Sequence, residues 1–365
     1  VDRSKIFAVK RMFRNEGSDC YSAVNTAVCA DREVAFLQDF AAHPLEFPHT
    51  VRLHRVLSAP CAEPCAVLEY CPFDLSSCVI KRNSKRNRAG DQQWPEAFPG
   101  PVQAWLFREV LRGLQELHSH NIVHRDVKLS NVLIRSDGSI CLSDFGSARR
   151  CGDEDNKAAE SGSATRFASP SALRTTLLYR SPESLLGALP FEHLKAQDAW
   201  SAGVLFAELL RGRHVFNAHG ELSMINQVFT LVGTPTHEEW PEFYASPIWQ
   251  SFQFQSCVPS LNEKFKYATS GEGLNLLQSL LHPNPTKRLS IASALQHAYF
   301  DVTITSETPS IWGRIFSTAM EHDSKPVSSG VADAFLKMQQ LLNGGAGDDE
   351  DDDEEDDCEN RFSFQ

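Results

Sequence analysis

The stretch from Ile122 to Gly146, IVHRDVKLSNVLIRSDGSICLSDFG, constrains the fold of this 365-residue chain more than any other. Within it, the apolar segments VLI and SICLS lie on either side of the turn signal Ser136-Asp137-Gly138, and this pattern predicts a strand hairpin. A hairpin brings the loop that precedes it beside the loop that follows it. The sequence therefore predicts a small space lined by two carboxylates, an amide and an ammonium group, from Asp126, Lys128, Asn131 and Asp144.

These four side chains have the chemistry that the transfer of a phosphoryl group needs. Asp126 would accept the proton of the attacking hydroxyl, and Lys128 would neutralise the moving phosphate. Asn131 and Asp144 offer the oxygen ligands that Mg²⁺ prefers. The alternative is that these polar residues fell into loops by chance, and their fixed offsets disfavour it.

The triplets His124-Arg125-Asp126 and Asp144-Phe145-Gly146, in which Asp144 follows Asp126 by eighteen residues, resemble the catalytic and metal loops of the eukaryotic protein kinases. Residues 176–183, TLLYRSPE, resemble the end of the activation segment in the CMGC group of that family. Leu231-Val232-Gly233-Thr234-Pro235 and Trp240-Pro241 resemble the insert specific to that group. The resemblance runs from about Ile6 to Phe300 and is to the cyclin-dependent kinases within the CMGC group.

The resemblance implies an α+β, bilobal protein kinase fold, with a small β-rich N-lobe and a large helical C-lobe. We assign residues 1–70 to a partial N-lobe and 71–300 to the C-lobe, with an insertion at 81–100. Residues 301–345 would form a C-terminal extension, and 346–365 an acidic disordered tail. The chain starts at the expected third strand, so the first two strands and their glycine-rich loop are missing, and we expect a fragment of a longer chain.

In the N-lobe, Ile6-Phe7-Ala8-Val9-Lys10 resembles the strand whose lysine binds the α- and β-phosphates of the nucleotide. Asp31 to Phe40 has helical apolar spacing, and Glu33 within it would hold Lys10 by an ion pair. The Arg32-Glu33 pair matches the end of the cyclin-contacting helix, which makes a cyclin or cyclin-like activator a candidate partner.

Residues 51–57 and 65–70 are predicted to be two further strands. The second leads into a segment that resembles the hinge where the adenine binds. By that resemblance Leu68 is the gatekeeper, Glu69 and Cys71 offer backbone groups to the nucleotide, and Asp74 faces the ribose.

The resemblance also assigns structural and regulatory residues. Thr176 and Asp198 would form hydrogen bonds with the catalytic loop, and Arg288 would pair with Glu183. Phosphorylation would act at Ser171, and its phosphate would tie together three arginines from separate elements: Arg32, Arg125 and Arg149. The alternative is that acids of the same loop, Asp153 to Asp155 or Glu160, neutralise these arginines without modification. An apolar stack between the lobes would comprise His124, Phe145, Leu37 and Leu53.

Composition limits the other classes of function. The formal net charge of −12 falls to −2 when the ten acids from Asp348 to Asp357 are removed. The ten cysteines are scattered, and only Cys61 and Cys65 lie close together, without a histidine pair, so zinc is disfavoured and reduced thiols are expected.

We expect a cytoplasmic or nuclear protein with no membrane partner. Binding of nucleic acid to the basic residues 81–88 is less favoured than a solvated loop. Val331 to Leu342 could form one amphipathic helix.

The function implied is that of a serine/threonine protein kinase, which transfers the γ-phosphate of ATP with Mg²⁺ as cofactor. Its protein substrates would carry Ser/Thr-Pro sites, since Arg180 and its neighbours resemble the pocket that accepts proline. The alternatives are a pseudokinase or scaffold, an inactive fragment without the glycine-rich loop, and an acidic-tailed chromatin adaptor.

Overall fold

The computed structural model describes residues 6–12, 20–59, 62–80, 98–151, 176–186, 193–245, 249–250 and 254–322. The chain divides into two compact units, Val1–Ala319 and Met320–Gln365. The first unit contains a small β-rich lobe and a large helical lobe, as predicted. The second is described only as far as residue 322, so the helix predicted for Val331 to Leu342 and the acidic tail lie outside the described residues.

The small lobe contains an antiparallel sheet of three described strands, β1 (Phe7–Arg11), β2 (Leu53–Ala59) and β3 (Ala62–Glu69), in the order β1-β3-β2. β3 is central and its middle is buried, whereas β1 alternates between half-buried and exposed side chains from Ala8 to Arg11, as one covered face requires. Lys10 pairs with Ala66 in this register. The three predicted strands of this lobe are confirmed, with small shifts at their ends.

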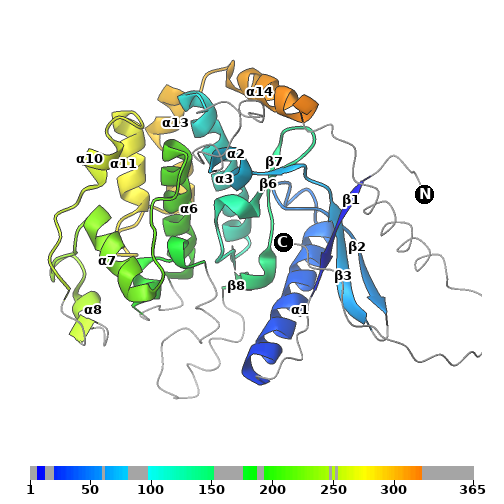
Figure 1. Cartoon of the computed structure of the whole chain (residues 1–365), viewed down its shortest axis with the longest axis horizontal. Coiled ribbons are helices and arrows are strands. Elements are labelled where there is room, and N and C mark those ends of the chain that lie inside the picture. Colours follow the sequence, from blue (N-terminus) through cyan, green and yellow to red (C-terminus); the bar gives the residue numbers. More distant parts are fainter. Residues whose placement is uncertain are drawn as a thin grey trace, which may run out of the picture. The chain divides into compact units, whose positions relative to one another are not determined.

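Helix α1 (Cys20–Ala42) lies beside this sheet (Figure 1) and starts earlier than the predicted helix at Asp31. Its buried residues recur at helical spacing and include Glu33, Leu37 and Phe40. The Phe40 ring packs edge-on against Phe145, with 4.8 Å between centroids. This apolar contact fixes α1 over the metal loop, so that Glu33 faces the same region.

The predicted hairpin is present as β6 (Val132–Ile134) and β7 (Ile140–Leu142), which β4 (Phe73–Asp74) extends in the order β4-β6-β7. Gly138 in its turn has φ +82°, a conformation that favours glycine. A second small sheet pairs β5 (Ile122–Val123) with β8 (Arg149–Arg150). Together they bring the loop after β5 and the loop after β7 side by side, as the sequence predicted.

The large lobe is helical, and its core forms around α3 (Gly100–Ser119) and α6 (Leu194–Arg211). The two helices meet through stacked Phe107 and Phe206 rings, 4.4 Å apart. Almost every residue of α6 is buried, which explains why Val204 to Leu210 is apolar apart from Glu208. The other described α-helices of this lobe are shorter: α2 (Leu75–Val79), α5 (Pro182–Leu185), α7 (Glu221–Val232), α8 (Pro241–Tyr244), α10 (Leu261–Phe265), α11 (Gly271–Leu280), α12 (Ile291–Leu295) and α13 (Ala298–Thr303).

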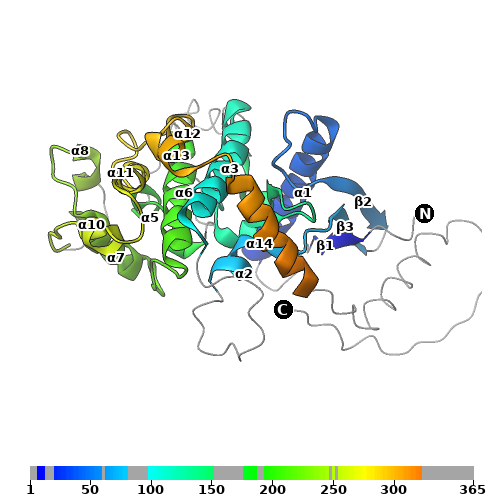
Figure 2. The same cartoon turned by 90° about the horizontal axis from the view of Figure 1, so that it is seen from above.

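Helix α14 (Thr308–His322) lies within the predicted C-terminal extension, where no such helix was predicted. One end of it lies by α3 in Figure 2, where the Trp312 ring is 6.1 Å from that of Trp105 in α3, and Trp312 and Phe316 are buried. The Trp312 indole donates a 2.8 Å hydrogen bond to the carbonyl oxygen of Gly138, in the turn between β6 and β7. The start of the extension therefore covers the outer end of the hairpin. Residues 81–97 of the predicted insertion lie outside the described residues.

Candidate active site

A cleft of about 450 Å³ lies where β1, α1 and the two loops of the hairpin meet. Four of its lining residues carry charged side chains that the sequence had singled out: Lys10, Glu33, Asp126 and Asp144. They come from four segments spread over 135 positions of the chain. The fold therefore brings together the central set of residues predicted for phosphoryl transfer.

Lys10 contacts two carboxylates in this cleft. Its Nζ lies 2.6 Å from Glu33 Oε1 and 2.9 Å from Asp144 Oδ1. Burial alone would lower the pKa of Lys10, but the two carboxylates outweigh it and raise the pKa. Burial also raises the pKa of Glu33, against the attraction of Lys10. The result is an ammonium group that stays charged and is fixed in place beside the metal loop.

Asp126 accepts hydrogen bonds at both carboxylate oxygens. Lys128 Nζ and Asn131 Nδ2 donate to Oδ2, at 2.7 and 3.1 Å. The backbone N–H and the hydroxyl of Thr176 donate to Oδ1, at 3.0 and 2.9 Å. Burial raises the pKa of Asp126, but these partners outweigh it and hold the pKa below its ordinary value. The side chain is thus an oriented carboxylate at neutral pH, which can accept a hydrogen bond from a substrate hydroxyl.

The catalytic loop is held in place by Asp198, which is fully buried in α6. Its two oxygens accept the backbone N–H groups of His124 and Arg125, each at 2.8 Å, and one also accepts His118 Nε2 at 2.9 Å. Burial raises the pKa of Asp198, but His118 and the other partners outweigh it and lower the pKa. Arg125 has φ +68°, which is strained for a residue with a Cβ, and Asp198 compensates for part of that cost.

His124 connects the catalytic loop to the metal loop. Its Nε2 donates to the carbonyl oxygen of Ser143 at 3.0 Å, and its Nδ1 accepts the N–H of Asp126 at 3.2 Å. The ring also packs on Phe145, with 5.1 Å between centroids, and Phe145 in turn contacts α1, where Leu37 is buried. This arrangement fits the predicted apolar stack, although Leu53, its fourth predicted member, is only half-buried in β2.

Asn131 and Asp144 fit the requirements of a hard cation. Asn131 Nδ2 donates to the carbonyl oxygen of Asp126 at 2.8 Å, so the amide oxygen is the end left for a cation. Asp144 has φ +66° and ψ +70°, and its carboxylate is 42% exposed, toward the cleft that it lines. A carboxylate and an amide oxygen are suitable Mg²⁺ ligands.

The predicted hinge residues do not line this cleft. Glu69, at the end of β3, forms an ion pair in which Arg135 Nε lies 3.0 Å from each carboxylate oxygen. The Asp74 carboxylate caps α2 by accepting the N–H of Ser77 at 2.8 Å. Cys71, which lies between Glu69 and Asp74 in the sequence, is half-buried. The expected nucleotide contacts of Glu69 and Cys71 use backbone groups, and they stay a prediction, as does the contact of Asp74 with the ribose.

Arg288 forms two hydrogen bonds with Glu183, at 2.7 and 2.8 Å, in an ion pair with both side chains fully buried. Arg32 Nη1 donates to the carbonyl oxygen of Gly146 at 3.3 Å. Arg125 and Arg149 are described, but Ser171 and the acids at 153–155 and 160 lie outside the described residues. The regulatory role of these residues stays a prediction.

Sequence reasoning missed several polar residues that position the site. His118 supports Asp198, and Tyr179 donates to Glu208, which also accepts His214 Nδ1 at 2.8 Å. Burial raises the pKa of Glu208 although both partners act to lower it. An acid within the apolar run Val204 to Leu210 was the available signal for Glu208. Tyr179 lies within the matched segment 176–183, but nothing there indicated its contact with Glu208, and no pattern marks His118.

Residues 1–300 match the protein kinase domain model. The chain belongs to the protein kinase family. It is 35% identical over 234 residues to the probable KIN28 homolog of Encephalitozoon cuniculi, a match that covers 64% of this chain and 66% of that protein. It is 31% identical over 278 residues to cyclin-dependent kinase D-1 of Arabidopsis thaliana, covering 75% of this chain and 60% of the relative. The chain thus spans less than two thirds of these relatives' length.

A solved structure leads to the same class. A chain of the yeast RNA Pol II CTD kinase CTDK-1 complex matches with a TM-score of 0.63 and 29% identity, covering 81% of this chain and 86% of that one. The family and the bilobal α+β fold predicted from the sequence are confirmed. Within the family the chain groups with cyclin-dependent-kinase-like serine/threonine kinases. None of the described helices combines the length and the apolar character that crossing a membrane requires.

Proposed function

We propose that this protein transfers the γ-phosphate of ATP to serine or threonine hydroxyls of other proteins, and that it prefers sites followed by proline. The observation that carries the proposal is the pairing of an ionised Asp126, held by Lys128 and Thr176, with Lys10 fixed by Glu33 and Asp144. A proton acceptor and a phosphate-binding cation thus line one cleft.

Each residue has one role in this proposal. Asp126 orients the substrate hydroxyl and accepts its proton, while Lys128, within 2.7 Å of it, neutralises the γ-phosphate. Lys10 binds the α- and β-phosphates, and Glu33 keeps its ammonium in place. Asn131 and Asp144 would hold Mg²⁺, which supplies charge neutralisation of the phosphates when bound.

The preference for proline and the partners belong to the same proposal. Arg180, which follows the 3₁₀ turn Leu177–Tyr179, lies in an ion pair with Glu221 of α7, 2.6 Å apart. This pair orients the segment that resembles the proline-accepting pocket.

A cyclin-like activator would contact α1, because that helix carries Glu33. Similarity to a chain of an RNA Pol II CTD kinase complex supports a nuclear site of action.

The test is phosphotransfer by the protein to a library of serine and threonine peptides, with Mg·ATP and with excess chelator. Transfer that depends on Mg²⁺, with enrichment for proline after the acceptor, supports the proposal. Asp144→Asn is expected to raise the Mg²⁺ concentration needed for activity, whereas Asp301→Asn, an exposed acid of α13, is not. Binding of ATP without any transfer would favour the pseudokinase alternative. Transfer without enrichment for proline would contradict the proposed preference for proline but not the proposed phosphotransfer.

A further inference from the structure

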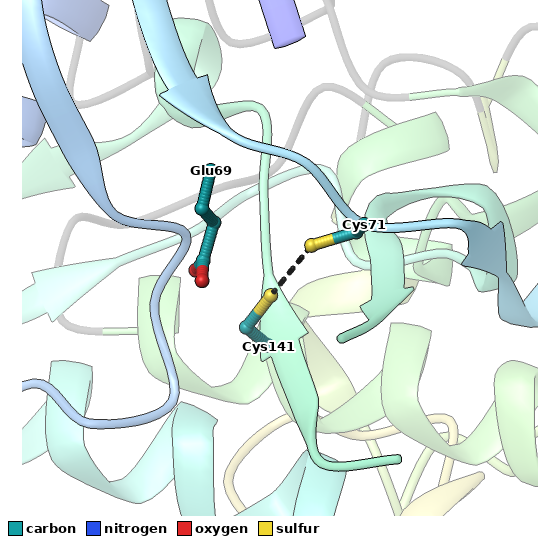
Figure 3. Close-up of side chains that lie close together, drawn as sticks. All are labelled: Glu69, Cys71 and Cys141. Carbon is teal, nitrogen blue, oxygen red and sulfur yellow. Dashed lines mark hydrogen bonds between the residues drawn. The ribbon is translucent and has the colours of Figure 1, made fainter. Parts of the chain in front are cut away.

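At the predicted hinge, outside the residues that line the cleft, two thiols and a carboxylate lie close together (Figure 3). Cys71 Sγ lies 3.8 Å from Cys141 Sγ, although the two residues are 70 positions apart in the chain. The ligand atoms of Glu69, Cys71 and Cys141 all lie within 4.8 Å of one another. Glu69 ends β3, Cys71 follows it by two residues, and Cys141 lies in the middle of β7.

We propose that Glu69, Cys71 and Cys141 form a binding site for a thiophilic divalent cation of the Zn²⁺ class, with the fourth position left to water. Soft thiolate ligands select such ions over Mg²⁺ or Ca²⁺. This site is separate from the proposed Mg²⁺ site at Asn131 and Asp144, and it does not depend on phosphotransfer.

The spacing of the two sulfur atoms fits this ion. Zn–S bonds of about 2.3 Å at a tetrahedral angle place two sulfurs about 3.8 Å apart. The observed separation of Cys71 Sγ and Cys141 Sγ is 3.8 Å. A disulfide would need about 2.05 Å between the same atoms, so the sulfurs would have to approach by well over 1 Å.

The charges around the cluster favour the bound state once both thiols lose their protons. Arg135, buried beside Glu69, supplies a positive charge to the cluster. Without metal, Arg135 balances the charge of Glu69, with which it forms an ion pair. Binding of the divalent ion releases two protons to solvent. Two thiolates and one carboxylate then balance the metal ion and Arg135, which leaves the buried cluster without net charge.

The surroundings already orient the carboxylate ligand. Glu69 accepts Arg135 Nε at both oxygens and the backbone N–H of Arg52 at 2.9 Å. Hydrogen bonds of this kind from outer residues are typical of carboxylates that ligate metals. Cys141 is fully buried, whereas Cys71 and Glu69 are half-buried, so a metal ion can enter from the hinge side.

The experiment uses the whole chain, reduced, stripped with a chelator and titrated with Zn²⁺ and separately with Co²⁺. We expect a thiolate-to-cobalt charge-transfer absorption that one equivalent of Zn²⁺ abolishes. Because the chain has ten cysteines, the decisive quantity is the difference between wild type and variants. Cys71→Ser should lose that absorption and one equivalent of bound Zn²⁺, and Glu69→Gln should weaken Zn²⁺ binding about tenfold or more.

Cys257→Ser is the matched control, since Cys257 is also half-buried and free but lies far along the chain from the cluster. It should bind both metals as wild type does. Cys141 is buried, so if Cys141→Ser fails to fold, Cys71→Ser is the variant that tests the proposal. Added Zn²⁺ should raise the Tm of wild type and of Cys257→Ser but not that of Cys71→Ser. Equal Co²⁺ spectra in wild type and Cys71→Ser would overturn the proposal. A Cys71–Cys141 disulfide in protein that binds no metal would also overturn the proposal. Mass spectrometry would detect this disulfide as the loss of two hydrogens.

Discussion

Lys10 and Asp144 form an ion pair with 2.9 Å between Nζ and Oδ1, although they lie 134 positions apart in the chain. The contact joins β1 of the small lobe to the loop after β7 of the large lobe. Glu33 holds the same ammonium from α1, so three separate elements meet at one cation. The geometry of the candidate site therefore depends on how α1 is positioned, which is where an activating partner would act.

Loss of the Glu33 carboxylate should loosen Lys10. In Glu33→Gln the charge-assisted hydrogen bond to Lys10 is weakened, and such bonds contribute about 1.5–3 kcal/mol. We expect kcat/KM for ATP to fall about tenfold or more, with little change in thermal stability. Asp31→Asn, an exposed acid on the same helix, serves as control. Steady-state kinetics with varied ATP check this, and equal values for Glu33→Gln and the control would contradict it.

Asp198 should act by positioning the catalytic loop. Asp198→Ala removes the acceptor of two buried backbone N–H groups, those of His124 and Arg125, and each unsatisfied donor costs about 1–3 kcal/mol. We expect a lower free energy of unfolding and a fall in kcat at temperatures where the variant is still folded. Denaturant unfolding and kinetics on the folded fraction measure both. An unchanged kcat would mean that Arg125 keeps its strained backbone without this support.

The buried pair of Glu183 and Arg288 should matter for stability far more than an exposed pair. Glu183→Gln leaves the buried guanidinium without its counter-charge, which typically costs about 3–5 kcal/mol. Glu263→Gln breaks an exposed pair with Lys266 and should change stability by less than about 1 kcal/mol. Urea unfolding of the two variants compares them directly. Similar losses in both would show that burial does not set the cost.

Stability should depend on pH through His49. This ring lies between Glu109 and Glu116, whose hydrogen bonds raise its pKa from 6.5 to about 9. The folded state therefore binds the proton more tightly than the unfolded state. The stabilisation is complete below pH 6.5 and is lost as pH rises through about 9. His49→Gln should remove this dependence, so its unfolding free energy, measured with urea, should fall less than that of wild type between about pH 6 and pH 9.5. Parallel pH profiles for the two proteins would contradict this.

The sequence predicted which side chains of the loops would lie together, because their spacing is local. Asp126, Lys128 and Asn131 share one short loop, and the hairpin that places Asp144 beside them is marked by its turn residues.

The resemblance supplied some long-range contacts, such as Arg288 with Glu183, but others left no trace in the sequence. Nothing near Cys71 indicates Cys141, and nothing in residues 301–345 indicated that Trp312 would donate to Gly138. The Glu69–Arg135 pair was not predicted either, because that contact arises only when β3 and the hairpin come together.

Phosphotransfer by Asp126→Asn tests the central claim most directly. The substitution keeps the size of the side chain and the hydrogen bond from Thr176, but it removes the charge that accepts the proton. The protein and this variant would be compared for transfer from Mg·ATP to a serine peptide, alongside their affinity for ATP. We expect the rate to fall by about 10²–10⁴-fold while ATP affinity stays within a few-fold of wild type. An unchanged rate would contradict the assignment of Asp126 as the catalytic carboxylate.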